Sequence, residues 1–154
     1  MAEYNFDDIR CYNDEDIPAK LWPLADRPEI QAVIKAGFPE VDLEQMKALI
    51  RSCKTVKDFQ TKVIIFFLDL LCSKCTDGVE AVGIENIDDS LGHLFVTNHR
   101  DIVLDSALLN VLLAKHGKET SEIAIGNNLF AAPWIEDLVR VNKSFVVRRD
   151  ITGR

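Results

Sequence analysis

FVTNHRDIVLDSALLN, residues 95–110, is the stretch that decides the fold of this 154-residue chain. Its first residues are β-branched and aromatic, as is typical of a strand. The apolar run that follows is too long for a strand and ends in Lys115-His116-Gly117, which is a C-terminal helix signal. Between the two lie a His, an Arg and an Asp. The stretch therefore predicts a strand that delivers polar side chains to the start of a helix.

The same alternation extends on both sides of this stretch. Strands are expected at 79–84, 93–98, 122–128 and 144–149, and helices at 102–117 and 133–142. The first half has helical spacing and helix signals throughout, at 27–37, 42–53 and 55–75. We expect an α/β fold: an acidic lead and helical N-terminal subdomain over residues 1–77, and a layer of alternating strands and helices over residues 78–154.

The longest expected helix begins at Thr55, which has Asp58 three positions later in the arrangement of a capping pair. Its apolar residues have helical spacing and should share the inner face. The expected inner stripe consists of residues 59, 63, 66, 67, 70 and 71.

Charge is unevenly distributed in this acidic chain, whose net charge is −7. Residues 1–29 hold eight acidic and three basic residues, a net of −5, whereas residues 140–154 hold five basic residues and one acidic residue, a net of +4. This balance argues against a general nucleic-acid binder. It is compatible with an anionic small molecule that docks near the C-terminal end.

The chain shows no membrane or secretion signal. Its start is acidic, and its most apolar stretch, residues 63–72, is interrupted by Asp69 and is half the roughly twenty residues that a span requires. We expect a cytoplasmic protein that is soluble or lies peripherally at the inner membrane surface.

The four cysteines include one CxxC pair, Cys72 and Cys75, which could form half of a zinc site or a redox pair. A zinc site needs two further ligands at suitable spacing, and the pair ends a helical pattern instead of following a strand. We expect reduced cysteines, no metal site and no cofactor.

The tripeptide His99-Arg100-Asp101 also opens the catalytic loop of protein kinases. Position 106 is Ser where a kinase has Asn, and the glycine-rich loop, the strand lysine and the Asp-Phe-Gly motif are missing. The kinase interpretation is therefore rejected.

Residues 95–110 resemble the first block of the glycerol-3-phosphate and lysophosphatidate acyltransferase superfamily, in which a strand delivers a His and the next helix holds an Asp. AIGNNLFAAPWIEDLVRVNKSFVVRR, residues 124–149, is similar to the second block, with its Gly-x-Asn-Leu turn and Arg-Arg strand end. The two blocks occur in the family's order, and the resemblance covers residues 78–149. It implies an acyltransferase sheet layer and an enzyme of phospholipid biosynthesis.

By this resemblance His99 is the general base. The family separates its His and Asp by four residues, but five separate His99 from Asp105. We expect Asp105 to orient His99, with one extra residue in the turn; Asp101 is the competing candidate and is also suited to capping a helix that starts at Ile102. The substrate's own hydroxyl would be the nucleophile, so no catalytic Ser or Cys is required.

The resemblance implies an acyl thioester donor, either acyl-CoA or an acyl carrier protein, and a phosphorylated glycerol or lysolipid acceptor. Amide and basic side chains of the second block would bind the anion, since the arginine fork matches phosphate. These candidates are Asn127, Asn128, Arg140, Lys143, Arg148 and Arg149.

The family's third block, a Glu-Gly-x-Arg element, and its fourth block do not occur in the sequence. We therefore expect an N-terminal fragment of an acyltransferase domain that is weakly active or inactive, with an open sheet edge that would allow self-association. A non-catalytic fragment or interaction module that retains the fold is the alternative.

Overall fold

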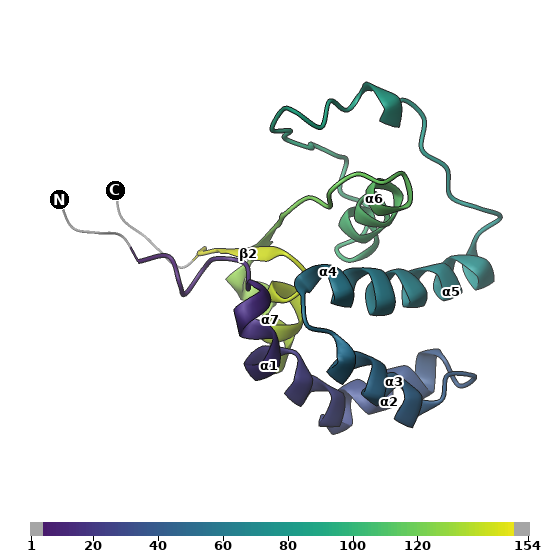
Figure 1. The fold of residues 1–154 in the computed structure, drawn as a ribbon, viewed down its shortest axis with the longest axis vertical. Coiled ribbons are helices and arrows are strands. Elements are labelled where there is room, and N and C mark those ends of the chain that lie inside the picture. The colour runs from purple at the N-terminus through teal and green to yellow at the C-terminus, as the bar shows by residue number, and fades with distance from the viewer. Residues whose placement is uncertain (1–4, 150–154) are drawn as a thin grey trace. The chain divides into compact units, whose positions relative to one another are not determined.

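The computed structural model describes residues 5–149 (Figure 1). The ends of the two expected domains lie outside this range: they are residues 1–4 and 150–154. Arg154, one of the basic residues counted above, is among them. The chain forms two compact units, residues 1–63 with 122–154, and residues 64–121. The expected boundary after residue 77 stays a prediction.

Helices form most of the first unit, and local signals define their ends. They are α1 (Ile17–Lys20), α2 (Pro28–Gly37), α3 (Leu43–Ser52) and α4 (Val56–Phe59). The Asp42 side chain caps α3 by accepting a hydrogen bond from the N–H of Gln45 at 2.8 Å, and α3 buries Met46 and Ile50. The helices expected at 27–37 and 42–53 are confirmed. Short 3-10 helices at Asp14–Asp16 and Trp22–Asp26 precede them.

The expected capping pair forms at α4. Thr55 Oγ1 accepts from the N–H of Asp58 at 2.9 Å, and Asp58 accepts from the N–H of Thr55 at 3.3 Å. A π-helical turn, Gln60–Ile64, follows α4, and α5 (Ile65–Cys75) continues from it. The helical run expected at 55–75 is therefore confirmed, with a change of winding inside it.

The π turn changes which residues are buried. Phe59 and Val63 are buried as expected, but Phe66 is 43% exposed and Leu68 is buried in its place. A π turn closes its hydrogen bonds over five residues instead of four, so it inserts one residue into the helical repeat. The inner stripe after Val63 is shifted for this reason, and its expected continuation at residue 66 is wrong.

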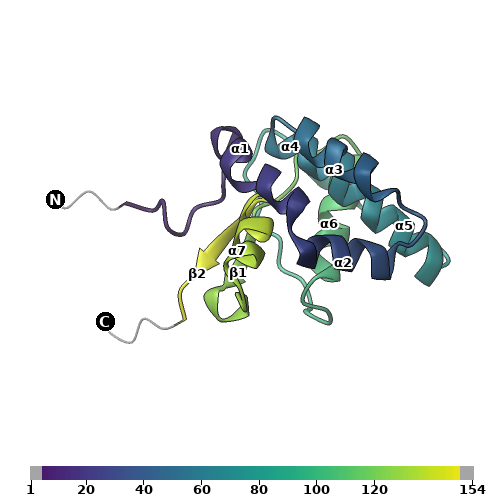
Figure 2. The same ribbon diagram turned by 90° about the horizontal axis from the view of Figure 1, so that it is seen from below.

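The first unit also contains a β-α-β element. β1 (Ile123–Gly126) and β2 (Ser144–Val147) form a two-stranded parallel sheet, with Ile123 beside Ser144 and Gly126 beside Val147. The 3-10 helix Asn127–Leu129 and α7 (Pro133–Arg140) connect them, and Figure 2 shows α7 alongside the strands. Two of the four expected strands and the helix expected at 133–142 are thereby confirmed.

The second unit pairs α5 with α6 (Leu104–Lys115), the helix expected at 102–117 (Figure 1). Between them, the strands expected at 79–84 and 93–98 are not formed; the only regular element there among the described residues is the 3-10 helix Ile84–Asn86. A strand needs a neighbour to satisfy its backbone groups, and neither stretch has one. The structure thus combines helices with one small parallel sheet, in agreement with the α/β class.

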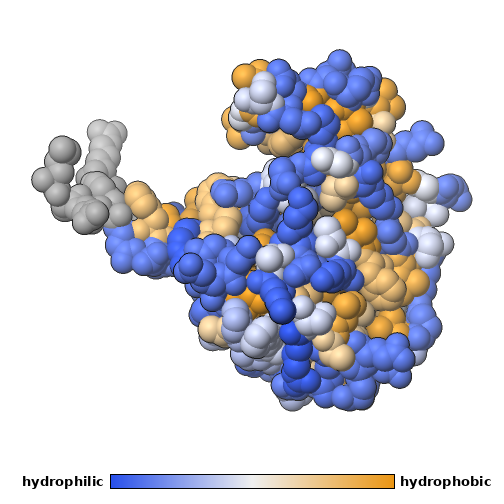
Figure 3. All heavy atoms as spheres, in the orientation of Figure 1, coloured by the Kyte–Doolittle hydropathy of each residue, from blue (hydrophilic) through white to orange (hydrophobic). Residues whose placement is uncertain are grey.

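Apolar side chains remain exposed where those strands were expected. Val82 is 97% exposed, Leu94 89% and Val96 84%. Figure 3 shows apolar residues at the surface among polar ones. Within residues 5–149, none of the helices has the length and apolar content to cross a membrane.

Candidate active site

His99 and Asp105 meet at the start of α6. Asp105 lies in the first turn of the helix, and its Oδ2 is 3.4 Å from Nδ1 of His99. The same oxygen accepts hydrogen bonds from the backbone N–H groups of Arg100, at 2.7 Å, and Asp101, at 2.9 Å. These bonds fold the segment after His99 back over the helix start. The five intervening residues therefore do not separate the two side chains.

Asp101 binds the backbone of the helix start. Its Oδ1 accepts from the N–H groups of Val103 and Leu104, each at 2.8 Å. The first N–H groups of a helix have no partner within it, and a preceding carboxylate commonly satisfies them. The regular helix starts at Leu104, two residues later than expected from Ile102, although Asp101 binds the N–H groups two and three residues ahead of it as a capping carboxylate does.

Both carboxylates are stabilised in their ionised form. The N–H of Asp101, then the N–H of Arg100 and the neighbouring His99, lower the pKa of Asp105, while partial desolvation opposes them. The N–H groups of Leu104 and Val103 lower the pKa of Asp101. An ionised Asp105 can accept the Nδ1–H of the imidazole and so leave Nε2 as the basic nitrogen. The His99 side chain is 66% exposed, so a substrate hydroxyl can reach it.

A second group of polar side chains lies in the first unit, where β1 and β2 end. Parallel strands bring their carboxyl ends to one edge, which is where open α/β sheets bind ligands. Asn127 and Asn128 follow β1, and Arg148 and Arg149 follow β2. The N–H of Arg149 donates to Oδ1 of Asn127 at 3.0 Å. The structure thus brings four of the predicted anion-binding residues to one edge.

Gly126, the last residue of β1, is essential to this arrangement. A Cβ atom at this position would lie 2.5 Å from Oδ1 of Asn128 and 2.8 Å from Nε of Arg149. The side chains of Asn128 and Arg149 therefore lie so close to residue 126 that only glycine, which has no Cβ atom, leaves room for both of them. Sequence reasoning identifies Gly126 as part of a turn and misses it as a site residue; its place at the end of a strand, before two amides, was the available signal.

Arg140 differs from its expected role. Its side chain is almost fully buried and lies over the ring of Tyr12, with Cζ 4.2 Å from the ring centroid. Its guanidinium donates to the carbonyl oxygens of Asp7, at 2.6 Å, and Arg10, at 3.0 Å, and pairs with Glu136 at 2.8 Å. These partners use the donors that a phosphate would need. We therefore leave Arg140 out of the candidate anion site.

Lys143 and Arg148 lie at opposite ends of β2. Lys143 precedes the strand, has a positive φ of 59°, and its carbonyl accepts from the N–H of Ile123 at 2.9 Å. Five residues at the rise of a strand separate it from Arg148 by about 16 Å. Lys143 is thus not gathered with the two amides. Arg148 follows β2 at the same edge as the amides, and its side chain forms an ion pair with Asp8.

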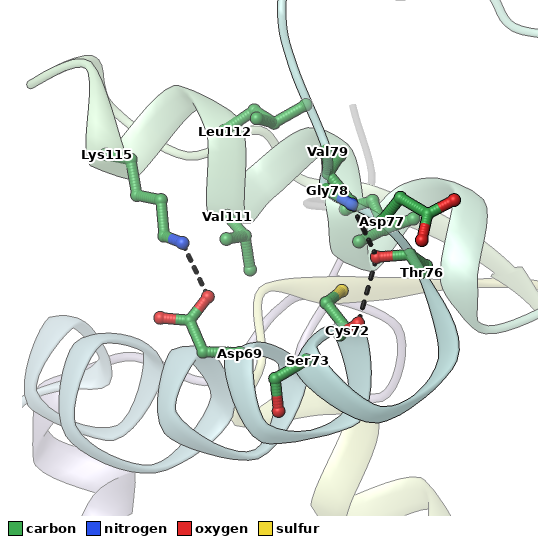
Figure 4. Close-up of a pocket in the computed structure, with 11 residues that line it drawn as sticks. Asp69, Cys72, Ser73, Thr76, Asp77, Gly78, Val79, Val111, Leu112 and Lys115 are labelled. Atoms are coloured by element: carbon green, nitrogen blue, oxygen red, sulfur yellow. Dashed lines mark hydrogen bonds and ion pairs between the residues drawn. The ribbon is translucent and has the colours of Figure 1, made fainter.

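A separate pocket lies within the second unit, between α5 and α6 (Figure 4). Its volume of about 340 Å³ is at the lower end of the range for ligand sites. Val111 and Leu112 line it, and Lys115 bonds Asp69 across it at 2.5 Å. Neither His99 nor Asp105 lines this pocket.

The CxxC cysteines lie in the last turn of α5, with Cys75 exposed and Cys72 partly buried beside the pocket. All four cysteines are free thiols. In the part of the chain that the structure describes, no group of three His, Cys, Asp or Glu side chains could hold a metal ion.

Comparison with known families identifies a family for this chain. The Acyltransferase family model matches residues 78–154. The matched range contains His99 and Asp105 as well as the ends of β1 and β2. No curated protein and no solved structure matches the chain.

Proposed function

The chain belongs to the Acyltransferase family, the glycerol-3-phosphate and lysophosphatidate acyltransferases, and from that premise we propose that it transfers an acyl group from a thioester to a hydroxyl. The acceptor we propose is a phosphorylated glycerol or a lysolipid, and the donor is acyl-CoA or an acyl carrier protein. The observation that carries the proposal is the approach of Asp105 to Nδ1 of His99 at 3.4 Å.

In the proposed reaction, Nε2 of neutral His99 takes the proton of the acceptor hydroxyl while the hydroxyl oxygen attacks the thioester carbonyl carbon. Asp105 accepts the Nδ1–H, fixes the tautomer and stabilises the imidazolium that forms. The C–S bond then breaks, and the imidazolium returns the proton to the leaving thiolate. Such positioned proton transfer contributes about 10²–10⁴-fold to a rate.

The fixed position of Asp105 supports this role. Its two backbone hydrogen bonds hold the carboxylate before substrate arrives, and they lower its pKa, so it stays ionised at neutral pH. The His99–Asp105 distance exceeds that of a normal hydrogen bond; catalytic pairs are commonly looser before substrate binds.

We propose that the acceptor's phosphate binds at the carboxyl ends of β1 and β2. Asn127, Asn128, Arg148 and Arg149 supply amide and guanidinium groups there. The arginine fork binds two phosphate oxygens at once. The non-catalytic alternative gains no support, because it requires neither the His99–Asp105 pair nor this cluster.

The test is release of thiol from long-chain acyl-CoA in the presence of glycerol 3-phosphate, with a parallel reaction using an acylated carrier protein. The control is the His99→Gln variant, which keeps a polar side chain but lacks the base. We expect slow thiol release that depends on both the acceptor and His99. Equal release by the variant and the unsubstituted chain with both donors would overturn the proposal.

A further inference from the structure

The acidic segment at the N-terminus is fixed against β2 and α7. The carbonyl of Ile9 accepts from the N–H of Val146 at 2.8 Å, and the N–H of Tyr12 donates to the carbonyl of Arg140 at 3.1 Å. The buried guanidinium of Arg140 holds the carbonyls on either side of Ile9, those of Asp7 and Arg10. Four hydrogen bonds thereby hold the six residues from 7 to 12 in place.

These contacts determine where the side chain of Asp8 lies. As the segment proceeds from Ile9 to Tyr12, its partners proceed from Val146 back to Arg140, so it runs against the direction of β2. Asp8 is therefore placed toward the carboxyl end of the strand. There its carboxylate forms an ion pair with Arg148.

Arg148 thus already has an anion beside it. A carboxylate offers two oxygens to a guanidinium in the same planar geometry as a phosphate. Both side chains are about half exposed, 46% for Arg148 and 49% for Asp8, so water and dissolved anions can reach the pair.

We propose that Asp8 is an internal competitor for the phosphate group that Arg148 binds. The inference rests on the anion-binding role proposed above for the ends of β1 and β2. A phosphate must displace the Asp8 carboxylate from Arg148, or bind through Arg149 and the amides alone. Asp8 therefore lowers the affinity of this site for all phosphate ligands. Ligands with additional charge are favoured over the others, because that charge compensates for the loss of the Asp8–Arg148 ion pair.

The neighbouring Asp7 provides a matched control. Its side chain is in the same segment and carries the same charge, but it pairs with Arg10 at 3.0 Å. A general effect of negative charge near the site would appear in both the Asp7→Asn and the Asp8→Asn variants. Competition for Arg148 would appear in the second variant only.

The experiment is a titration of the ¹⁵N-labelled chain with inorganic phosphate at low ionic strength, followed at the backbone amide of Arg149. Exposed ion pairs are weak, so Asp8→Asn should tighten the dissociation constant about two- to fivefold, equivalent to ~0.4–1 kcal/mol. Asp7→Asn should change it less. The gain should shrink as sodium chloride is added, and Arg148→Gln should remove it.

Equal dissociation constants for the two Asn variants, or no phosphate binding by either, would overturn the inference. Its failure is distinguishable from failure of the proposed function. Acceptor-dependent thiol release with equal phosphate affinity in the two variants would refute competition by Asp8 alone. Tighter phosphate binding by Asp8→Asn without any thiol release would refute the acyl transfer alone.

Discussion

At the scale of single residues, His99 combines exposure with one fixed neighbour. Its side chain is 66% exposed and its structural contact is with Asp105, so it contributes little to packing. We expect His99→Ala to lower acceptor-dependent thiol release by at least about 100-fold, because the attacking hydroxyl loses its base. The melting temperature should not change. Activity within tenfold of the unsubstituted chain would remove His99 from the mechanism.

One matched pair of substitutions can distinguish the role of Asp101 from that of Asp105. Asp105→Asn keeps an oxygen for the N–H groups of Arg100 and Asp101 but loses the charge that stabilises the imidazolium, so turnover should fall by orders of magnitude. Asp101→Asn keeps a cap for Val103 and Leu104 and should retain most of the activity. Kinetics of both variants at neutral pH check this; a larger loss with Asp101→Asn would reverse the two roles.

The sequence contains the candidates for these roles but does not reveal their partners. The extra residue between His99 and Asp105 leaves the choice of carboxylate open, because spacing alone does not say which backbone N–H groups a carboxylate will accept. In the sequence, Arg140 looks like the exposed basic residues, because the sequence does not show which groups its guanidinium will bind. Its partners, the carbonyls of Asp7 and Arg10, are more than a hundred positions away along the chain.

At the scale of elements, the capping pair at α4 gives a pH dependence. Lys62 above all, with the backbone N–H of Lys54, lowers the pKa of Asp58 to about 2 from its ordinary 3.8. A lowered folded-state pKa contributes stability that is present above 3.8 and is lost as the pH falls toward 2. Asp58→Asn should therefore be less stable than the unsubstituted chain at pH 7.

Urea unfolding at pH 7 and at pH 2 measures this difference, which should largely vanish at the lower pH. A matched variant is Asp42→Asn at the start of α3, where the side chain accepts from the backbone N–H of Gln45. Its effect on stability at pH 7 should be small, because the Asn oxygen can accept the same bond. A difference for Asp58→Asn that is equal at both pH values would contradict the assignment.

The turn after β1 gives a second prediction at this scale. In Gly126→Ala the new methyl group would displace the side chains of Asn128 and Arg149, which are mobile at their ends and can move without unfolding the strand. We expect weaker binding of inorganic phosphate with little change in melting temperature. Gly37→Ala is the control, since its new methyl group would have no neighbouring atom within 4 Å. Unchanged phosphate binding by Gly126→Ala would place the anion elsewhere.

Element prediction succeeded where the signals were local. The caps at Asp42 and Thr55, the prolines that start α2 and α7, and the β-branched run of β2 each identify an element from adjacent residues. The π turn inside the helical run was not predicted, and for that reason the burial of Leu68 in place of Phe66 was not predicted either. The strands at 79–84 and 93–98 failed because strand formation depends on a partner.

At the scale of the whole molecule, the uneven charge of the sequence has a structural counterpart in the first unit. The acidic segment near the N-terminus and the basic residues after β2 lie together, through Asp8 and Arg148. The sequence shows two oppositely charged ends but not that they meet. It therefore predicts an anion site at the C-terminal end without predicting an anionic side chain already placed there.

The four cysteines sample both units and give a test of the fold as a whole. Cys75 is exposed at the end of α5, whereas Cys53 is buried and the N–H of the Trp22 indole donates to its carbonyl at 2.9 Å. Burial, reinforced by Glu122, raises the pKa of Cys11 to about 11, so little of its reactive thiolate forms at neutral pH. Maleimide at pH 7 should therefore modify Cys75 first, and Cys11 and Cys53 slowly.

Mass spectrometry of peptides taken at successive times measures each rate. Cys75→Ser should remove the fast phase and leave the slow modifications unchanged, since the exposed side chain carries no packing. Addition of urea should bring Cys53 to the rate of Cys75 as the first unit unfolds, because only unfolding exposes a fully buried thiol. Modification of Cys53 as fast as Cys75 in the absence of urea would mean that α3 and the 3-10 helix at Trp22–Asp26 do not pack as the structure has them.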